Sequence, residues 1–227
     1  MKKKIFYREW AYVFGLIIMA FASAFSEKAG FGMSMVVAPA YILHLKLSEL
    51  FSWFSFGVAE YIFQGFLVLL TIIIIRKVKL SYFLSFVTAI IYGTLLDFAM
   101  SVVSYLPNDT FFVRAIWYVI GVVACSFAVS LFFHTYLSPE VYELIVKEIS
   151  STFKLNINKV KTSYDCISTV LSIVLSFAFF GFGVFRGVGV GTIICALING
   201  FLIGNCSKLL NHFFEFKNAL KIDKYFK

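Results

Sequence analysis

The sequence is poor in charge, since Asp, Glu, Lys and Arg together make up only 14% of its 227 residues. Soluble domains usually contain about 25% charged residues. Hydrophobic residues make up 61% of the chain, with 29 Phe and 12 Tyr. No stretch is polar enough to form a separate soluble domain. The composition therefore predicts one transmembrane domain over residues 1–227.

Cysteine and histidine are also scarce, with four Cys and three His in the whole chain. The cysteines lie inside apolar segments and form no C-x-x-C pair, which argues against a disulfide framework or a zinc site. The glycine runs at 30–32 and 187–191 lack the Lys-Ser/Thr ending of a phosphate loop. We expect no cofactor, no metal site and no enzymatic activity.

Positive charge exceeds negative charge, with 20 Lys and Arg against 12 Asp and Glu. An excess of this size can indicate a nucleic-acid partner. Here the charges cluster beside apolar segments, where they mark the cytoplasmic side of a membrane protein. We therefore expect a lipid bilayer, and no nucleic acid, as the partner of this charge.

Six apolar segments are long enough to cross a bilayer, which takes about 20 residues of helix. They cover residues 10–26, 52–75, 80–104, 112–134, 162–182 and 189–211. Segments 30–44 and 138–153 are shorter and are predicted to form interfacial or re-entrant helices. In the second of these, Ser138 suits the cap, Pro139 the first helical position and Glu140 the helix dipole.

The basic residues also predict the orientation. With the N-terminus inside, only Lys28, Lys46, Arg114 and Arg186 of the 20 Lys and Arg residues lie outside. This is a strong positive-inside bias. An even number of crossings then returns the C-terminus to the cytoplasm, so both termini of this plasma-membrane protein are expected there.

The chain shows a weak internal repeat. The segment from Gly15 resembles the segment from Gly121 at an offset of 106 residues, and Tyr92-Gly93 resembles Asn199-Gly200 at an offset of 107. Residues 10–104 and 112–211 each contain three crossings and one short helix. Because three is odd, the second repeat must be inverted in the membrane, which is a common transporter plan.

Four segments in this order resemble the YczE/YyaS/YitT-like family of small bacterial membrane proteins. They are residues 26–34, 137–150, 159–165 and 189–192. The resemblance implies a bacterial plasma membrane and a transport-like activity. Met35 follows Ser34 where members often carry Pro, and Pro139-Glu140 replaces an acidic-Gly turn, so the resemblance does not imply a particular ligand.

Two carboxylates inside apolar segments, Glu60 and Asp97, are the strongest candidates for function, because a charge at the centre of a bilayer costs about 2.5–3.5 kcal/mol. Trp53 and Gln64 are predicted to share the helix face of Glu60. We expect Glu60, Gln64 and Asp97 to line a pocket that opens outward. Aromatic and acidic groups there would suit a cationic or amine-bearing solute.

The alternative for Glu60 and Asp97 is a structural ion pair with Lys28, Arg114 or Arg186. Asp165 is likewise expected to pair with Lys159 or Lys161 at the inner interface, and the serines that follow it can bond their own helix.

Helix 189–211 carries the small-residue pattern Gly200-x-x-x-Gly204, which allows close helix packing inside the bundle or in a homodimer. Asn199 lies beside it and is a candidate to bind solute or a neighbouring helix.

The sequence thus favours a transporter of a small solute that works by alternating access between inverted repeats. An alternative is a substrate-binding membrane subunit, like those of energy-coupling-factor importers. Its Ala20-x-x-x-Ala24 pattern would dock a coupling subunit. A lipid-directed membrane enzyme is less favoured, since no catalytic set of His, Asp and Glu shares one face.

The predicted orientation can be tested with single cysteines in a variant that lacks the four native ones. Asn108→Cys should react with an impermeant thiol reagent added to intact cells, because it lies between outward-facing helix ends. Lys79→Cys should react only after the cells are opened. Labelling of Lys79→Cys in intact cells would contradict the topology.

Overall fold

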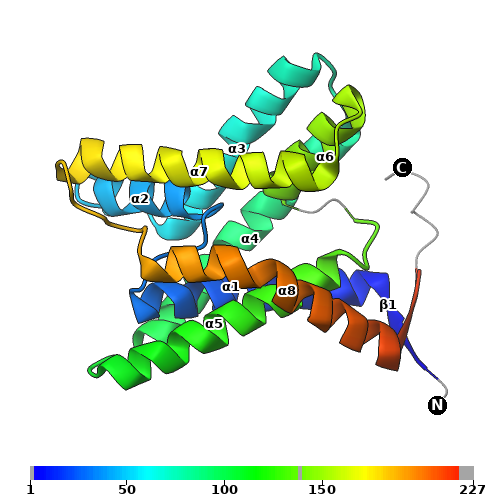
Figure 1. Cartoon of the computed structure of the whole chain (residues 1–227), viewed down its shortest axis with the longest axis horizontal. Helices are drawn as coiled ribbons and strands as arrows, with labels where there is room; N and C mark the ends of the chain where they lie inside the picture. The colour runs from blue at the N-terminus through cyan, green and yellow to red at the C-terminus, as the bar shows by residue number, and fades with distance from the viewer. Residues whose placement is uncertain (1–2, 138–139, 220–227) are drawn as a thin grey trace.

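The computed structural model describes residues 3–137 and 140–219, so the expected cap Ser138 and Pro139 lie outside the described residues. The described part is helical apart from two four-residue strands (Figure 1). In chain order the elements are β1 (Lys4–Tyr7), α1 (Arg8–Ala29), α2 (Ala38–Leu47), α3 (Phe56–Ile75), α4 (Leu80–Ser104), α5 (Phe111–Phe132), α6 (Val141–Phe153), α7 (Ile157–Phe180), α8 (Val190–Phe213) and β2 (Phe214–Lys217).

Six of these helices are long and apolar enough to cross a membrane, namely α1, α3, α4, α5, α7 and α8. They coincide with the six predicted segments. The largest differences are two helix starts: α7 was expected from residue 162 and begins at Ile157, and α3 was expected from residue 52 and begins at Phe56. Ser55 has an extended backbone, and its side chain accepts a hydrogen bond of 3.1 Å from the Val58 amide, which caps the helix.

Both short helices form, but α2 begins at Ala38, eight residues after the predicted start at residue 30, whereas α6 closely matches the predicted segment 138–153. α2 packs against α3 and α7, while α6 packs against α3, α4 and α7. The amphipathic face of α6 is buried through Val141, Leu144 and Ile145. Glu148 of α6 lies 2.6 Å from the Lys79 amino group, so an ion pair fixes this helix to the residue before α4.

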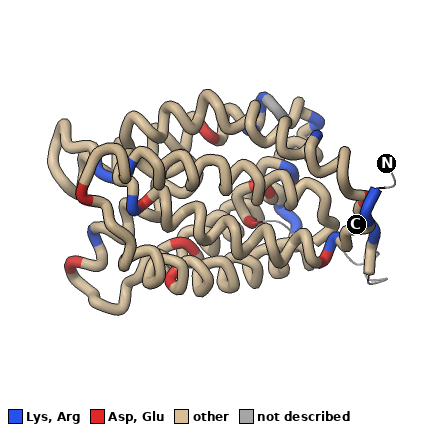
Figure 2. The backbone as a smooth tube through the Cα atoms, turned by 90° about the horizontal axis from the view of Figure 1, so that it is seen from below, with Lys and Arg blue, Asp and Glu red and all other residues tan. Residues whose placement is uncertain are grey.

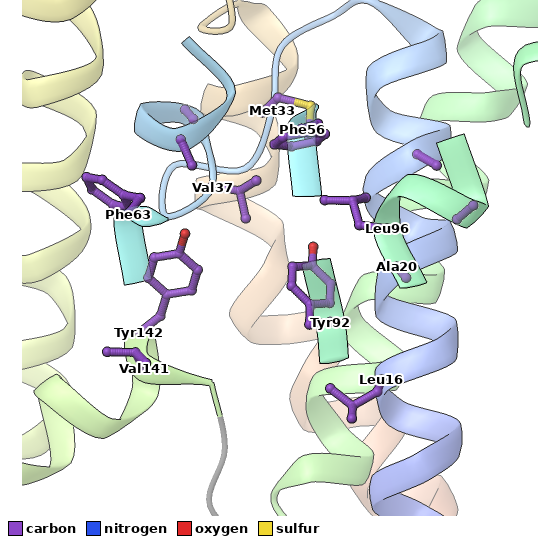
Figure 3. Close-up of a cluster of buried hydrophobic side chains, with 14 of the residues drawn as sticks. Leu16, Ala20, Met33, Val37, Phe56, Phe63, Tyr92, Leu96, Val141 and Tyr142 are labelled. Atoms are coloured by element: carbon purple, nitrogen blue, oxygen red, sulfur yellow. The ribbon is translucent and has the colours of Figure 1, made fainter. Parts of the chain in front are cut away.

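The centre of the molecule is the pair α1 and α5, with α4 against α1 and α8 against α5. Small buried residues, including Ala20 and Ala24, face this core. Small side chains let helix backbones approach closely where the surrounding solvent is lipid. Leu16, Tyr92 and Leu96 fill the space around them (Figure 3).

The parallel pairing of β1 with β2 was not predicted. Lys4 pairs with Phe214 and Tyr7 with Lys217, and the Phe6 ring contacts the rings of Phe214 and Phe216. The first and last described elements therefore lie together at one end of the bundle, as Figure 2 also shows. An even number of crossings between them is consistent with this arrangement.

Glycines mark one tight and one open helix surface. Gly57 on α3 and Gly93 on α4 bring two backbones together, because a Cβ atom on Gly93 would lie 2.6 Å from the Gly57 carbonyl oxygen. Gly200 and Gly204 on α8 face open space, since a Cβ atom on either would have no other described residue within 4 Å. The expectation that they pack inside the bundle is therefore wrong for this chain by itself.

This contrast predicts opposite effects of two Gly→Ala changes. Gly57→Ala should lower the free energy of unfolding by about 1–3 kcal/mol, because its methyl group collides with the backbone of α4. Gly200→Ala should leave stability unchanged or raise it by up to about 1 kcal/mol, because Ala favours helix. Melting of the purified variants measures both. Equal melting temperatures for the two variants would contradict the close approach of α3 and α4.

Candidate functional site

Glu60 lies near the middle of the bundle, fully buried in helix α3. Its Oε2 accepts hydrogen bonds from the Tyr142 hydroxyl at 2.7 Å and from Gln64 Nε2 at 3.2 Å. Gln64 is also fully buried and follows Glu60 by one helical turn. The shared helix face of these two residues, expected from their spacing, is therefore present and is directed toward α6.

Gln64 connects α3 to the first turn of α6. Its Oε1 accepts a hydrogen bond of 3.1 Å from the Val141 amide. The first amides of a helix have no partner within the helix, and a buried helix start needs such an acceptor from elsewhere. One side chain of α3 thus positions the start of α6 directly over Glu60.

Glu140, the residue before α6, is the second carboxylate of this site and is only 3% exposed. Burial raises its pKa well above the usual value, and the nearby carboxyl groups of Glu143 and Glu60 raise it further. Glu60 Oε1 and Glu140 Oε1 are both buried, and neither has a hydrogen-bond partner among residues 3–137 and 140–219. A proton or a bound cation would stabilise each of these two buried oxygens.

Three tyrosine rings of the hydrophobic core lie around this acidic site. Tyr142 and Tyr92, from α6 and α4, both belong to the central hydrophobic cluster (Figure 3). The Tyr92 hydroxyl lies 2.8 Å from the Ser23 hydroxyl, so α4 is hydrogen-bonded to α1 beside the site. Tyr164 of α7 packs at the edge of the same cluster.

Asp97 of α4 contacts the start of α3. Its Oδ1 accepts a hydrogen bond of 2.7 Å from the Gly57 amide, and its Oδ2 accepts one of 2.5 Å from the Ser55 hydroxyl. Asp97 of α4 therefore caps the first turn of α3, where a negative charge also complements the helix dipole. Asp97 reaches α3 at Gly57, three residues before Glu60. The carboxyl groups of Asp97 and Glu60 therefore lie about one helical turn apart along α3.

The basic residues proposed as ion-pair partners contact other groups. Arg114 donates to the Ala29 carbonyl at 2.7 Å, and Lys28 donates to the Ser104 carbonyl at 2.8 Å. The Arg186 guanidinium lies 3.9 Å from Glu49. The expected pairing of Glu60 or Asp97 with one of these three residues is not what the structure shows.

The remaining candidates lie outside this site. Trp53 precedes α3 and is 64% exposed, so it does not share the helix face of Glu60 as its spacing suggested. Asn199 of α8 accepts a hydrogen bond of 2.8 Å from the Ser126 hydroxyl of α5 and joins these two helices. Asp165 forms the expected ion pair with Lys161, at 3.0 Å.

An outward-open pocket around Glu60, Gln64 and Asp97 was expected, but Glu60 and Gln64 are sealed in this conformation because α6 packs over them. Two hollows lie elsewhere. One, of about 20 Å³, lies between α1, α5 and α8 and has room for about one water molecule. The other is an open recess of about 680 Å³ on α7, lined by Lys159, Thr162, Ser163, Cys166 and Ile167.

The comparison with known families covers nearly the whole bundle. Residues 6–208 match the model of a family of unknown function, DUF6198. The chain belongs to this family. The match includes all six candidate spans up to the last turn of α8, both short helices, and the two carboxylates of the site. No curated protein and no solved structure matches the chain.

Two groups of this DUF6198 protein's site were missed by the sequence analysis. Glu140 was interpreted only as a favourable charge at a helix start, and Tyr142 was not considered. A signal was present, because Tyr142 lies beside Val141 on the face of α6 that is otherwise apolar. Ala20 and Ala24 were the motif that would dock a coupling subunit. Both residues are buried within the chain, so this motif does not form an exposed docking surface here.

The capping role of Asp97 can be tested by substitution. Asp97→Ala should lower the free energy of unfolding by about 1–2 kcal/mol, because the first turn of α3 loses its acceptor. Asp97→Asn should lose less, since its amide oxygen can still accept from Gly57. The exposed Asp109→Ala is the control, with a change within about 0.5 kcal/mol. Full stability of Asp97→Ala would contradict the cap.

Proposed function

We propose that this protein transports a small solute across the bacterial plasma membrane, with both termini in the cytoplasm. Residues 10–104 and 112–211 form the two inverted repeats, and α2 and α6 are their re-entrant helices. The observation that carries the proposal is the packing of the helices. The two halves share most of their helix neighbours, but two contacts of the helices in one half have no equivalent of similar extent in the described residues of the other.

The repeated neighbours follow from exchanging α1 with α5, α2 with α6, α3 with α7 and α4 with α8. The contact of α1 with α4 then becomes that of α5 with α8. The contact of α2 with α7 becomes that of α6 with α3, and the contact of α2 with α3 becomes that of α6 with α7. Correspondence of this kind is expected of an inverted repeat and supports it beyond the few sequence matches.

The smaller exception is the contact of α6 with α4, which has no α2–α8 counterpart of similar extent among residues 3–137 and 140–219. The larger exception is the last pair of each half. α3 packs along α4 through Gly57 and Gly93, whereas α7 and α8 do not pack along one another in the described part of the chain. α7 lies instead against α2 and α6, apart from α8 (Figure 1). Only 17% of the apolar stretch of α7 and 11% of that of α8 are buried inside the molecule. The corresponding share is 39–50% in the other four spans.

This asymmetry is what alternating access requires. In such transporters the two repeats take different conformations, and exchanging those conformations turns the site to the other side of the membrane. In the predicted orientation, the contact of Gly57 with Gly93 closes the outer end. The corresponding contact at the inner end is open, and the recess on α7 lies there. The conformation is therefore assigned as closed outward and open inward.

The charge of the interior favours a cationic or amine-bearing solute. Glu60 and Glu140 are buried carboxyl groups, and Glu143 lies near Glu140. A buried acidic site attracts cations and repels anions. Glu60 itself is sealed beneath α6, so the opening between α7 and α8 does not reach it in this conformation.

The opposite conformation predicts a specific contact. The offset of 106 residues places Ser163 of α7 where Gly57 lies in α3, and Gly200 of α8 corresponds to Gly93. Ser163→Cys with Gly200→Cys, in a chain without its four native cysteines, should form an intramolecular disulfide under mild oxidation. Mass spectrometry of the linked peptides in membranes measures it.

The control pair is Val170→Cys with Gly200→Cys, which uses the same two helices about two turns away from the expected contact. It should link much less. A dimer linked through Gly200→Cys alone would show that a second copy covers this face, in line with a homodimer. Equal linking of the two pairs, or none in either, would contradict the proposed exchange of conformations.

A further inference from the structure

We propose that Glu60 and Glu140 together form a proton-binding carboxyl pair inside the membrane domain, and that this proton drives or gates transport. The coupling part of this inference rests on the proposed function, whereas the binding of the proton does not. The pair joins α3 to the start of α6 and is assembled only by the fold, since 80 residues separate its members in the sequence.

The first argument is the balance of hydrogen-bond donors. Glu60 Oε2 has two donors, Tyr142 and Gln64, but Glu60 Oε1 has none in the described part of the chain. Glu140 Oε1 is in the same position. A buried carboxylate oxygen without a donor is strongly disfavoured, and a proton on the carboxyl group removes most of that penalty.

The second argument is the charge of the neighbours. The groups that act on Glu140 through their charge are Glu143 and Glu60, both acidic. Glu140 directly precedes the first two residues of α6, which hydrogen-bond to Gln64 and Glu60, so both carboxyl groups lie at the same contact between α3 and α6. Neighbouring carboxyl groups disfavour each other's ionised form, which favours a proton on one of them. Lys161, the base that acts on Glu143, is already paired with Asp165 at 3.0 Å.

Helices α1, α4, α5, α6 and α7 contribute titratable groups that interact with the pair, and these groups have to be considered in any pH experiment. Those that interact electrostatically with Glu60, Glu140 or Glu143 are Tyr12 of α1, Tyr92 of α4, Cys125 of α5, Tyr142 of α6, and Lys161, Tyr164 and Asp165 of α7. Tyrosine and cysteine in such surroundings stay neutral at physiological pH. The carboxyl groups therefore account for titration between about pH 4 and pH 9.

A route for the proton runs toward the predicted cytoplasmic end. Glu143, on the first turn of α6, interacts electrostatically with Glu140 and with Lys161 and Asp165 of α7. In the sequence, Asp165 stands between Ser163 and Cys166, which line the α7 recess. Titratable groups thus extend from the buried pair toward the open recess on α7.

The test uses dicyclohexylcarbodiimide, an apolar reagent that adds to protonated carboxyl groups, on the purified full-length protein. Peptide mass spectrometry measures the labelled fraction at each carboxyl group between about pH 5 and pH 9. Glu60 and Glu140 should be labelled at neutral pH, while the exposed Glu49 and Glu215 should not. Labelling of Glu140 should fall as pH rises.

The coupling between the two carboxyl groups gives the sharper result. Glu60→Gln keeps the shape of the side chain and removes its charge, so the midpoint of Glu140 labelling should move down by about one pH unit. The matched control Glu49→Gln is at the surface and should leave that midpoint unchanged. A shift of equal size in both variants would overturn the pair.

Two other outcomes also overturn the proposal. Absence of label at both Glu60 and Glu140 throughout the pH range, in protein whose melting curve shows that it is folded, would mean that neither holds a proton. Suppression of the label by sodium but not by choline at constant pH would mean that the pair binds a metal cation instead.

Thermal melting provides an independent readout. Because burial raises the pKa of Glu140, the folded protein holds this proton more tightly than the unfolded chain does. Its contribution to stability is therefore present at acidic pH and is lost as pH rises.

The proton site and the alternating-access mechanism can fail separately. A normal labelling pattern without the α7–α8 disulfide would leave the proton site in place and remove only the alternating-access mechanism.

Discussion

The absence of water from the bilayer interior is the constraint on which the rest of the structure depends. Every buried polar group must find its partner within the protein, since lipid offers none. Helix ends meet this need through side chains of other helices. Asp97 of α4 caps α3, Gln64 of α3 caps α6, and Arg114 of α5 binds the last carbonyls of α1. These bonds fix the helices relative to one another more specifically than apolar contacts can.

The same constraint makes the exceptions informative. Glu60 and Glu140 each keep one buried oxygen without a partner in the described part of the chain, next to a helix end that is otherwise well satisfied. Asp97 and Gln64 each satisfy the amides of a helix start, whereas these two carboxyl oxygens have no hydrogen-bond donor among residues 3–137 and 140–219. The uneven packing of α3 with α4 and of α7 with α8 is a second exception. These two exceptions are the observations on which the proposed second conformation and the proposed proton site rest.

Much of the fold was predictable, because hydrophobic length alone identifies helices that cross lipid. All six spans and the presence of both short helices were expected, although α2 starts eight residues later than predicted. The amphipathic pattern of α6 indicated its buried face. The candidate site was predicted only in part. Glu60 and Gln64 were found from their spacing, but Trp53 was assigned to the wrong element because Ser55 starts α3 later. Glu140 and Tyr142 were missed, since their importance depends on which helix faces them.

The sequence by itself determined the number of spans, the places of the short helices and the rarity of charge inside them. These properties depend on local composition and period, which lipid acts on directly. Only the tertiary structure decided that Asp97 caps a helix, that β1 pairs with β2, and that Gly200 faces open space. The same is true of the meeting of Glu60 with α6. These are contacts between residues far apart in the chain, and hydropathy carries no information about which faces of the helices meet.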